Sequence, residues 1–414
     1  MRRFITRHSQ IPDGSSYDGG HLFPVGETLI SELGEEQARL VGIRLKNMNF
    51  SGVILSSPFV RTLLTAEIIA EETGAKIVPF APVHEIFRNE SQITTYSGLT
   101  KEEIQKTFSH LVEDFELAYP WWPNKLESRD DVYSRVYAGV KLAEQLYGDV
   151  DILYVGHGAS CDALAHSYKI KKKRYPIMFN CSLSYVDDTS GKTKCVWCDT
   201  EHLPYSKTTS NFVTKPQFDI ERMTSSYDGA IETPDWLAAA NGKCVLHIGD
   251  SESQSYPYFK AVIDTLKPDV IIHTGDMADE VKVGRIPGTK EEYVYKISVM
   301  CEILENSGAK EIIIVPGNND LKEEIERLIP GALVLPEDST VTIDGVDCRL
   351  THNAAHFTPG CKWSFYGHGF THDAWDPANN CEGKECRFNA YRGATICSLV
   401  DERYTTIKLP SNEF

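Results

Sequence analysis

Histidine and arginine side chains recur in the first half of the chain where short apolar runs end. Arg7 and His8 follow the run "RRFIT", Arg61 follows "GVIL", and His157 follows "DILYVG". A guanidinium group matches the oxygens of a phosphoryl group, and a neutral imidazole can attack phosphorus. A single strand-end histidine is more often structural than catalytic, but this ordered combination predicts a phosphate pocket with a histidine nucleophile.

A second set of polar side chains occurs in the other half, in five short segments that each follow an apolar run. The segments are "HIGDSE", "HTGDMAD", "VPGNND", "LTHN" and "YGHGFTH". Their carboxylate, amide and imidazole groups belong to Asp250, Glu252, Asp276, Asp279, Asn318, Asn319, Asp320, His352, His368 and His372. Such mixed ligands at successive strand ends suit two divalent ions that share a bridging carboxylate. The order of the segments therefore predicts a two-metal site.

The remaining histidines and the cysteines give weaker signals. His247 and His273 lie within strand-like runs, where a hydrogen-bonded core histidine is the commoner outcome, so we predict structural roles for both. His356 is also expected to be structural, although its loop leaves it the option of reaching the metal site. The 11 cysteines are scattered, many of them in apolar runs, and act there as small buried side chains.

Alternating strands and helices are predicted to position these groups. In the first half, β-branched runs such as "GVILSS" and "DILYVG" alternate with helical patterns such as "RTLLTAEIIAEE". The second half repeats this alternation and becomes rich in strands after "ALVLP". Both halves are therefore predicted to be α/β. In open α/β sheets, ligands collect at the carboxyl ends of the strands, where the polar residues above occur.

The length of the chain predicts two domains. At 414 residues it exceeds what a single hydrophobic core usually supports. The polar, Ser/Thr-rich stretch "YSKTTSNFVTKPQF" shows neither the helix nor the strand period. We therefore predict a first domain at 1–204, a linker at 205–240 and a second domain at 241–414.

Charge and hydropathy exclude several classes of partner. The formal net charge of −17 opposes non-specific binding to nucleic acid or to an anionic membrane surface. No stretch approaches the roughly 18 apolar residues that a membrane helix needs. The opening "MRRFITRH" lacks the pattern of a signal peptide, so we expect a cytoplasmic protein. No oligomeric state is predicted.

Over roughly residues 1–190, the chain resembles the histidine phosphatase (phosphoglycerate mutase-like) superfamily. "TRHSQ" matches the Arg-His-Gly signature of that superfamily, with Ser9 in place of glycine. "SSPFVRTLLTAEII" matches its second-arginine segment, and "VGHGAS" its second-histidine segment. The resemblance implies a three-layer α/β/α domain.

The same resemblance implies a role for each motif residue. His8 would be the nucleophile that becomes phosphohistidine, and Arg7, Arg61 and His157 would neutralise the transferring phosphoryl group. Glu85 in "PVHEIF" matches the general acid that protonates the leaving oxygen, with Glu90 as a competing candidate. No metal or other cofactor is expected in this domain.

Over about residues 241–410, the chain resembles the calcineurin-like metallophosphoesterase superfamily, especially its small bacterial phosphodiesterases. The resemblance implies a four-layer α/β/β/α sandwich with two divalent metal ions, for which Mn, Fe or Mg are expected. Asp250 and His372 would hold one ion and Asp276 would bridge. The second ion would be held by Asn318, His352 and His368.

Three positions depart from the pattern of that superfamily. Glu252 stands where the family has a histidine ligand; a carboxylate can still bind, and it favours Mn, Mg or Fe. Asn319 stands where many members carry an acid-catalytic histidine. The gap between His368 and His372 is three residues instead of one.

The two resemblances together predict a bifunctional phosphoric ester hydrolase that acts on a small phosphorylated metabolite or nucleotide. The metal site would open a diester or a cyclic phosphate, and the histidine site would remove the resulting monoester. Two alternatives stay open: a phosphoprotein phosphatase, and a phospho-ligand-binding module in which one domain is a pseudoenzyme. Trp121 and Trp122 lie where specificity insertions occur and are expected to pack in the core more often than to stack on a substrate.

Overall fold

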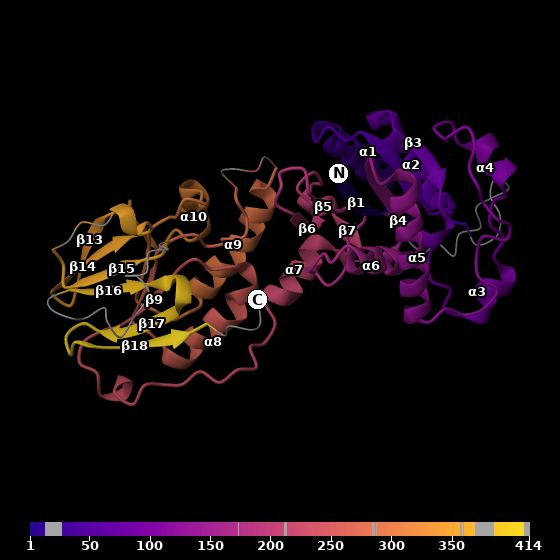
Figure 1. Cartoon of the computed structure of the whole chain (residues 1–414). Coiled ribbons are helices and arrows are strands. Elements are labelled where there is room, and N and C mark those ends of the chain that lie inside the picture. The colour runs from indigo at the N-terminus through magenta and orange to yellow at the C-terminus, as the bar shows by residue number, and fades with distance from the viewer. Residues whose placement is uncertain are drawn as a thin grey trace. The chain divides into compact units, whose positions relative to one another are not determined.

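The computed structural model describes residues 1–12, 27–172, 174–210, 213–283, 286, 288–356, 358, 360–368 and 385–409. The chain forms two compact units, Met1–Lys215 and Pro216–Phe414. Figure 1 shows both, with the colour running along the chain. The division falls inside the predicted linker 205–240. That segment has structure of its own: the short strands β7 (Thr209–Ser210) and β8 (Val213–Thr214) and helix α7 (Lys215–Met223).

The first unit is built on a six-stranded sheet with the strand order β3-β2-β4-β1-β5-β6. The four strands β1 to β4 pair in parallel, whereas β5 and β6 pair antiparallel at one side. Their bounds are β1 Arg2–Arg7, β2 Gly52–Ser56, β3 Lys76–Pro79, β4 Asp151–Gly156, β5 Leu183–Asp187 and β6 Lys194–Asp199.

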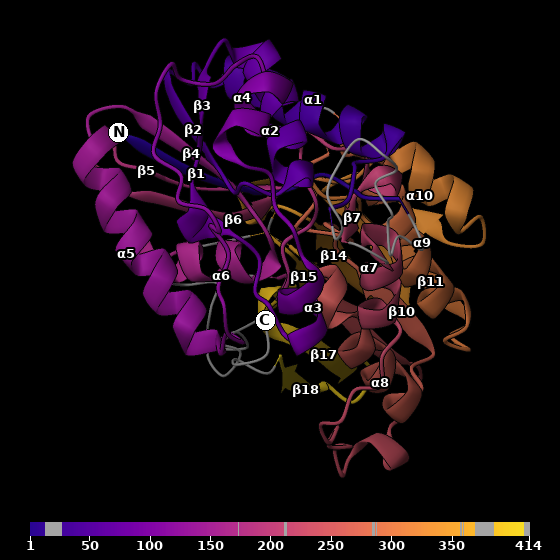
Figure 2. The same cartoon turned by 90° about the vertical axis from the view of Figure 1, so that its right-hand side faces the viewer.

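Helices cover both faces of this sheet. Helices α1 (Glu32–Asn47) and α2 (Val60–Thr73) pack together on one face, and α5 (Arg129–Tyr147) and α6 (Gly158–Ser167) pack together on the other (Figure 2). Two shorter helices, α3 (Glu90–Thr95) and α4 (Lys101–Thr107), lie in the long connection between β3 and α5. The predicted three-layer α/β/α architecture is confirmed.

Local sequence explains where these helices begin and which face they bury. The side chain of Ser31 accepts a hydrogen bond from the backbone N–H of Gly34 and so caps α1. Ala38, Val41 and Leu45 follow at helical spacing and are fully buried against the neighbouring layer. Ser128 and Asp131 form a reciprocal capping box at the start of α5.

The second unit contains a six-stranded and a four-stranded sheet. The larger sheet has the order β12-β11-β10-β9-β17-β18, and the smaller has the order β13-β14-β15-β16. The strand bounds are β9 Cys244–Ile248, β10 Val270–His273, β11 Glu311–Ile314, β12 Leu333–Val334, β13 Ser339–Ile343, β14 Val346–Thr351, β15 Trp363–Tyr366, β16 Cys386–Asn389, β17 Gly393–Ser398 and β18 Arg403–Lys408.

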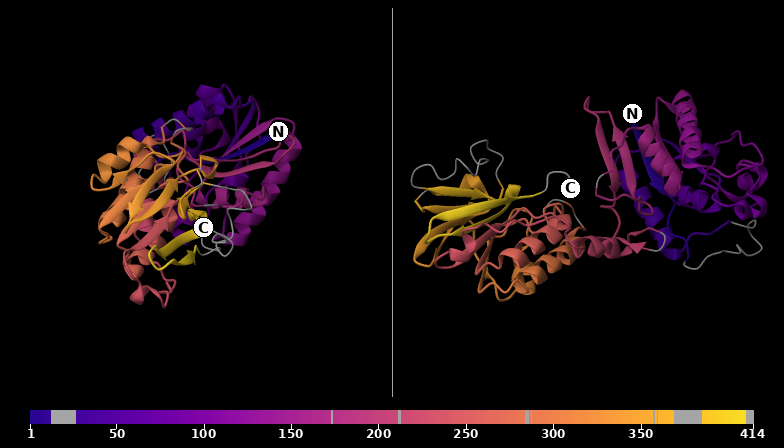
Figure 3. Two further views of the ribbon diagram at one scale, coloured as in Figure 1. Left: turned by 90° about the vertical axis from the view of Figure 1, so that its left-hand side faces the viewer. Right: turned by 90° about the horizontal axis from the view of Figure 1, so that it is seen from below.

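The two sheets pack face to face through a single apolar layer. Val245 and Ile272 of the larger sheet meet Trp363 and Phe365 of the smaller one in this layer. Alternation along the strands aligns such residues on one face. Helices α8 (Tyr256–Leu266) and α9 (Lys290–Glu305) cover the other face of the larger sheet (Figure 3). Helix α10 (Lys322–Leu328) packs on the same side.

The second unit is therefore α/β, as predicted. Three of the four predicted layers are seen among the described residues: the helices and the two sheets. Throughout the part of the chain that the structure describes, no helix combines the length and the apolar content needed to cross a membrane.

Candidate functional sites

In the first unit, the carboxyl ends of β1, β2 and β4 bring the predicted phosphate-binding residues together. His8 follows β1, and its backbone N–H donates to the carbonyl of Gly156, 2.9 Å away, at the end of β4. The rings of His8 and His157 lie with their centroids 5.3 Å apart. Adjacent parallel strands end at one edge of the sheet, which is why two motifs about 150 residues apart meet here.

The hydrogen bonds of His8 determine its protonation state. Its Nδ1 lies 2.8 Å from the carbonyl oxygen of Ser9, which can only accept, so Nδ1 carries the proton. Nε2 then has a free lone pair. Burial, together with the charges of Arg61 and Arg7, holds the pKa of His8 well below its ordinary value. A neutral imidazole with an unprotonated Nε2 has the form of a nucleophile.

His157 is held between a hydrogen-bond donor on one side of its ring and an acceptor on the other. Nη2 of Arg61 donates to Nδ1 of His157 over 3.1 Å, so the proton of the ring is on Nε2. Nε2–H then donates to Oγ of Ser57, 2.9 Å away. Burial and the Arg61 charge hold the pKa of His157 well below its ordinary value.

Arg7 lies in the floor of the same site. Its Nη1 donates to the carbonyl of Met178 over 3.0 Å and to Oγ of Ser210 over 2.9 Å. Burial lowers the pKa of Arg7, and the nearby Glu85 carboxylate partly offsets this shift. These contacts fix the direction of the guanidinium group and place a second positive charge beside His8.

Glu85 is placed at the site, whereas Glu90 is not. The Oε2 atom of Glu85 lies 3.9 Å from Nδ1 of His157. Glu90 is exposed in the first turn of α3. The geometry therefore favours Glu85 over Glu90 as the candidate general acid.

These groups surround a cavity of about 350 Å³, which we call the histidine cavity. It is lined by Arg7, His8, Ile11, Thr28, Phe59, Arg61, Glu85, Ile86, Phe87, Gln92, Thr95 and Tyr96. Phe59, Phe87 and Tyr96 pack with Trp121, which is buried and donates its indole N–H to the carbonyl of Leu99. Trp121 thus packs behind the aromatic residues of the cavity wall and does not itself line the cavity.

Several residues that support this site were missed in the sequence. Ser57 anchors His157, Ser210 anchors Arg7, and the side chain of Asn180 donates to the carbonyl of His8 over 2.8 Å. Ser57 follows β2 directly and lies in the quoted segment "SSPFVRTLLTAEII", so its position at a strand end could have identified it. Asn180 lies outside the named strands and Ser210 ends the two-residue strand β7, and no local sequence pattern marks either residue.

The substitution of Ser9 for glycine is accommodated without blocking the site. Ser9 is fully buried, and its hydroxyl lies 3.1 Å from Oγ1 of Thr65 on α2. The backbone N–H of Ser9 donates to the same oxygen, also over 3.1 Å. The side chain is therefore directed into α2, and Ser9 is not among the residues that line the histidine cavity.

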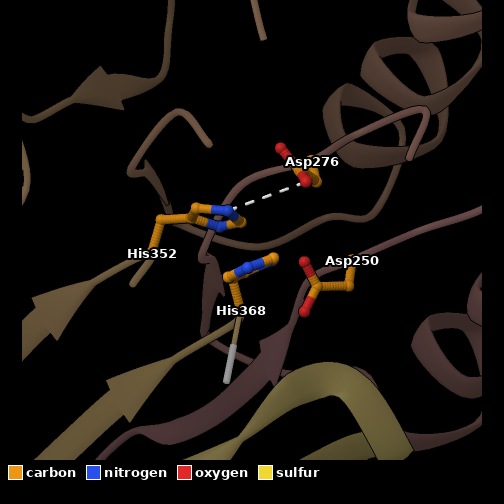
Figure 4. Close-up of side chains that lie close together, drawn as sticks. All are labelled: Asp250, Asp276, His352 and His368. Carbon is orange, nitrogen blue, oxygen red and sulfur yellow. Dashed lines mark ion pairs between the residues drawn. The ribbon is translucent and has the colours of Figure 1, made fainter. Parts of the chain in front are cut away.

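In the second unit, four predicted ligands converge on one point. Figure 4 shows Asp250, Asp276, His352 and His368 facing a common space, each from a loop at the end of a strand. One potential ligand atom from each lies within 4.8 Å of those of the other three. A group of two carboxylates and two imidazoles is typical of sites for divalent transition metals.

The surroundings of His352 fit a cation. Its Nδ1 donates to the carbonyl of Thr274 over 2.7 Å, which leaves the lone pair on Nε2. That lone pair faces the Oδ1 atom of Asn318 at 3.1 Å and Oδ2 of Asp276 at 3.6 Å. Three acceptor atoms directed at one another are satisfied by a shared cation.

The two aspartates fit a cation for the same reason. Burial and the neighbouring carboxylates raise the pKa of Asp250 well above its ordinary value and raise that of Asp276 to about 6. The buried Oδ2 atom of Asp250 has no hydrogen-bond partner among the described residues. Both residues have positive φ, 44° and 53°, so the backbone is constrained at both candidate ligands. The residues present therefore fit a divalent metal ion.

A further layer of hydrogen bonds holds Asp276 in place. Asn319 donates its backbone N–H and its side-chain amide to the two oxygens of Asp276, over 2.9 and 2.7 Å. The carboxylate of Asp320 accepts from the backbone N–H groups of Asp276 and Gly317. The "GNND" loop thus positions the candidate bridging carboxylate.

The other predicted ligands have different surroundings. Glu252 is not in the group of four: it precedes the turn Ser253–Ser255, and its Oε2 accepts from the side chain of Gln254. His372 lies outside the described residues. His247 and His273 are fully buried and bond to hydroxyl groups of Thr274 and Ser251.

His356 and Lys282 each pair with a carboxylate. His356 is exposed and pairs with Glu337. Lys282 was not singled out in the sequence. Its Nζ lies 2.6 Å from Oδ1 of Asp279. Its charge lowers the pKa of Asp250, but burial and the nearby aspartates raise that pKa by more.

Comparison with known proteins agrees with the two family resemblances. The sequence model of the histidine phosphatase superfamily (branch 1) matches residues 4–200, and that of calcineurin-like phosphoesterases matches residues 245–373. Over 166 residues the chain is 31% identical to a probable phosphoglycerate mutase GpmB of Photorhabdus laumondii, covering 38% of this chain and 73% of that protein. The chain belongs to the histidine phosphatase superfamily. Its second half is a calcineurin-like phosphoesterase domain.

Further relatives of this two-domain phosphatase are more distant. An uncharacterized phosphatase PhoE of Bacillus subtilis is 28% identical over 135 residues, which span 33% of this chain and 62% of that protein. The solved structure of Bacillus stearothermophilus YhfR matches with a TM-score of 0.35 and 21% identity, covering 49% of this chain and 98% of that one. Both families hydrolyse phosphoric esters, so the protein is a phosphoric ester hydrolase.

Proposed function

We propose that this phosphatase carries two independent sites, a metal-free phosphomonoesterase at His8 and a two-metal phosphodiesterase or phosphatase in the second unit. The contrast between the sites supports this division. The first places the positive charges of Arg7 and Arg61 near neutral imidazoles and so is built to receive an anion. The second directs carboxylates and imidazoles at one point and so is built to receive cations.

At the first site, Nε2 of His8 attacks the phosphorus atom of a monoester. The bond to the ester oxygen breaks, and Glu85 gives that oxygen its proton. Arg7, Arg61 and His157 stabilise the charge on the three equatorial oxygens. Water then attacks the phosphohistidine, gives its proton to Glu85, and releases inorganic phosphate from His8.

At the second site, Asp250, Asp276, Asn318, His352 and His368 would hold two divalent ions, and we propose Mn, Fe or Mg. His372 stays a proposed ligand of the same site, as does Glu252 if its side chain turns from Gln254. Bound ions would supply Lewis acidity and a water of lowered pKa. Asn319 keeps the Asp276 carboxylate in the orientation that ligation requires.

We further propose that the two sites act in sequence on a small phosphorylated metabolite or nucleotide. Hydrolysis of a diester produces a monoester, which is the substrate class of the His8 site. Two variants separate the steps. With Mn²⁺ and an alkyl phosphodiester, His8→Ala is expected to stop at the monoester, whereas Asp276→Asn leaves the diester intact.

Phosphorus NMR follows the diester, the monoester and free phosphate in one sample. Mixing the two variants is expected to restore complete conversion, because each supplies the site that the other lacks. The sequential proposal fails if either variant alone converts the diester to free phosphate at the rate of the unmodified protein.

A further inference from the structure

A second cavity adjoins the histidine cavity in the first unit. It measures about 500 Å³, and we call it the adjoining cavity. Arg7, Glu85 and Ile86 line both cavities, whereas His8 and Arg61 line the histidine cavity alone. The two spaces therefore meet at Glu85, the residue proposed to protonate the leaving oxygen. A group attached through that oxygen has room to extend into the adjoining cavity.

The adjoining cavity has more cationic than anionic side chains in its wall. Arg7, Arg88, Arg129 and Lys172 line it, against the carboxylates of Glu85 and Asp162. This excess of positive charge occurs in a chain with a formal net charge of −17. A local concentration of cations in a concave wall, against the charge of the whole chain, attracts anions.

Asp162 holds part of this wall in a fixed arrangement. Its Oδ2 accepts from Nη2 of Arg129 at 2.8 Å and from the hydroxyl of Tyr133 at 2.9 Å. Its Oδ1 pairs with Nζ of Lys172. One carboxylate thus fixes two cations that come from different segments, the start of α5 and the loop after α6. Fixed donors lose little conformational entropy when they bind a ligand.

Arg88 supplies a charge that is not neutralised in this way. It is exposed in the loop before α3. Among the described residues, no carboxylate forms an ion pair with its guanidinium group. A planar guanidinium group at the rim of a cavity is suited to bidentate binding of a phosphate or carboxylate.

Apolar side chains form the rest of the wall. Trp197 donates its indole N–H to the carbonyl of Tyr175 over 2.7 Å, and Nζ of Lys172 lies 5.5 Å from the centre of its ring. Ile86 and Ile177 are further lining residues. A short carbon skeleton can pack here between the reacting phosphate and a second anionic group.

We infer that the adjoining cavity is a second anion-binding subsite formed by Arg88, Arg129 and Lys172. The substrate of the His8 site is accordingly a phosphate monoester that carries a second phosphate or carboxylate group. This inference rests on the proposed monoesterase function.

The test compares α,ω-alkanediol bisphosphates of increasing length with the monophosphates of the same diols. We expect kcat/KM to be roughly tenfold or more higher for the best bisphosphate than for its monophosphate, since its second phosphate gains charge-assisted hydrogen bonds that the monophosphate lacks. Arg88→Ala and Lys172→Ala are expected to remove most of that preference, and Arg88→Lys to keep part of it. Lys171→Ala, an exposed neighbour outside the lining, is the matched control and should leave the preference intact.

Equal kcat/KM values for the two substrates, or a preference that survives both alanine variants, would overturn the inference. Calorimetric binding of a non-hydrolysable alkane bisphosphonate separates it from the catalytic proposal. Binding that Arg88→Ala weakens about tenfold, in a protein that hydrolyses neither substrate, would refute the monoesterase and retain the subsite. Binding that Arg88→Ala leaves unchanged would refute the subsite.

Discussion

At the scale of single residues, the two sites use opposite environments. Burial and two guanidinium groups keep His8 neutral by lowering its pKa. In the second unit, burial and neighbouring carboxylates raise the pKa of Asp250 and Asp276, and the opposing effects of Lys282 and His352 are too small to reverse this. An anionic ligand would balance the positive charges of the first site, and a cation would balance the carboxylates of the second.

The lowered pKa of His8 predicts the acid limb of monoester hydrolysis. The reactive form is the neutral imidazole, and an ordinary histidine loses it as the pH falls through about 6.5. Because the pKa is depressed in the folded protein, His8 stays neutral through that range, and activity persists until a lower pH. A pH profile of kcat/KM for a chromogenic monoester measures this. A loss of activity centred near 6.5 that is assigned to His8 would contradict the environment described here.

Asn319 is predicted to support metal binding without being a ligand. Its two hydrogen bonds orient the Asp276 carboxylate, and loss of such outer contacts costs roughly tenfold to a hundredfold in metal affinity. Calorimetric titration with Mn²⁺ should therefore show weaker binding by Asn319→Ala. The exposed Asn306→Ala variant is the matched control. Equal Mn²⁺ affinity in all three proteins would show that Asp276 does not need this support.

At the scale of elements, strand ends and the loops after them position nearly all of the candidate residues. In the first unit, helices α2 and α6 begin within a few residues of β2 and β4, which sets Arg61 and His157 beside His8. In the second unit, the loops after β9, β10, β11, β14 and β15 carry the metal-site residues.

A buried ion cluster fixes the loop after β10. Lys296 of α9 is fully buried, with Nζ 2.7 Å from Glu292, 3.0 Å from Glu280 and 3.4 Å from Asp219 of α7. Glu280 follows the metal-site loop and also accepts from the backbone N–H of Ser253. The cluster therefore ties two helices to the loops that carry Asp250 and Asp276.

Lys296→Met is predicted to destabilise the second unit by about 3 kcal/mol or more, since it removes a buried cation that pairs with three largely buried carboxylates. Lys290→Met, which removes an exposed pair with Glu324, should change stability by less than about 0.5 kcal/mol. Calorimetry of the full chain measures both, with the second unit's transition identified by its upward shift with Mn²⁺. Equal changes in stability for the two substitutions would show that the buried cluster contributes no more than the exposed ion pair.

The sequence predicted the strand-end residues better than their supports. Arg7, His8 and His157 could be predicted because strand patterns are local and the ends of parallel strands meet. Ser57, Asn180 and Ser210 hold these residues through contacts between segments distant in the chain, which no local period reveals. Glu252 fits the order of the metal motifs, yet its side chain bonds to Gln254.

At the scale of the whole molecule, the chain joins two hydrolytic sites with different requirements. In our proposal the histidine site works with its own side chains alone, whereas the second site works with ions held by its carboxylates and imidazoles. This separation means that removing metal should silence one activity and spare the other.

Assays of p-nitrophenyl phosphate and bis(p-nitrophenyl) phosphate with and without a metal chelator test that separation most directly. We predict that the chelator abolishes hydrolysis of the diester and that Mn²⁺ restores it, while most hydrolysis of the monoester persists and is lost only in His8→Ala. Loss of both activities on chelation, or persistence of both, would contradict the assignment of one metal-free and one metal-dependent site.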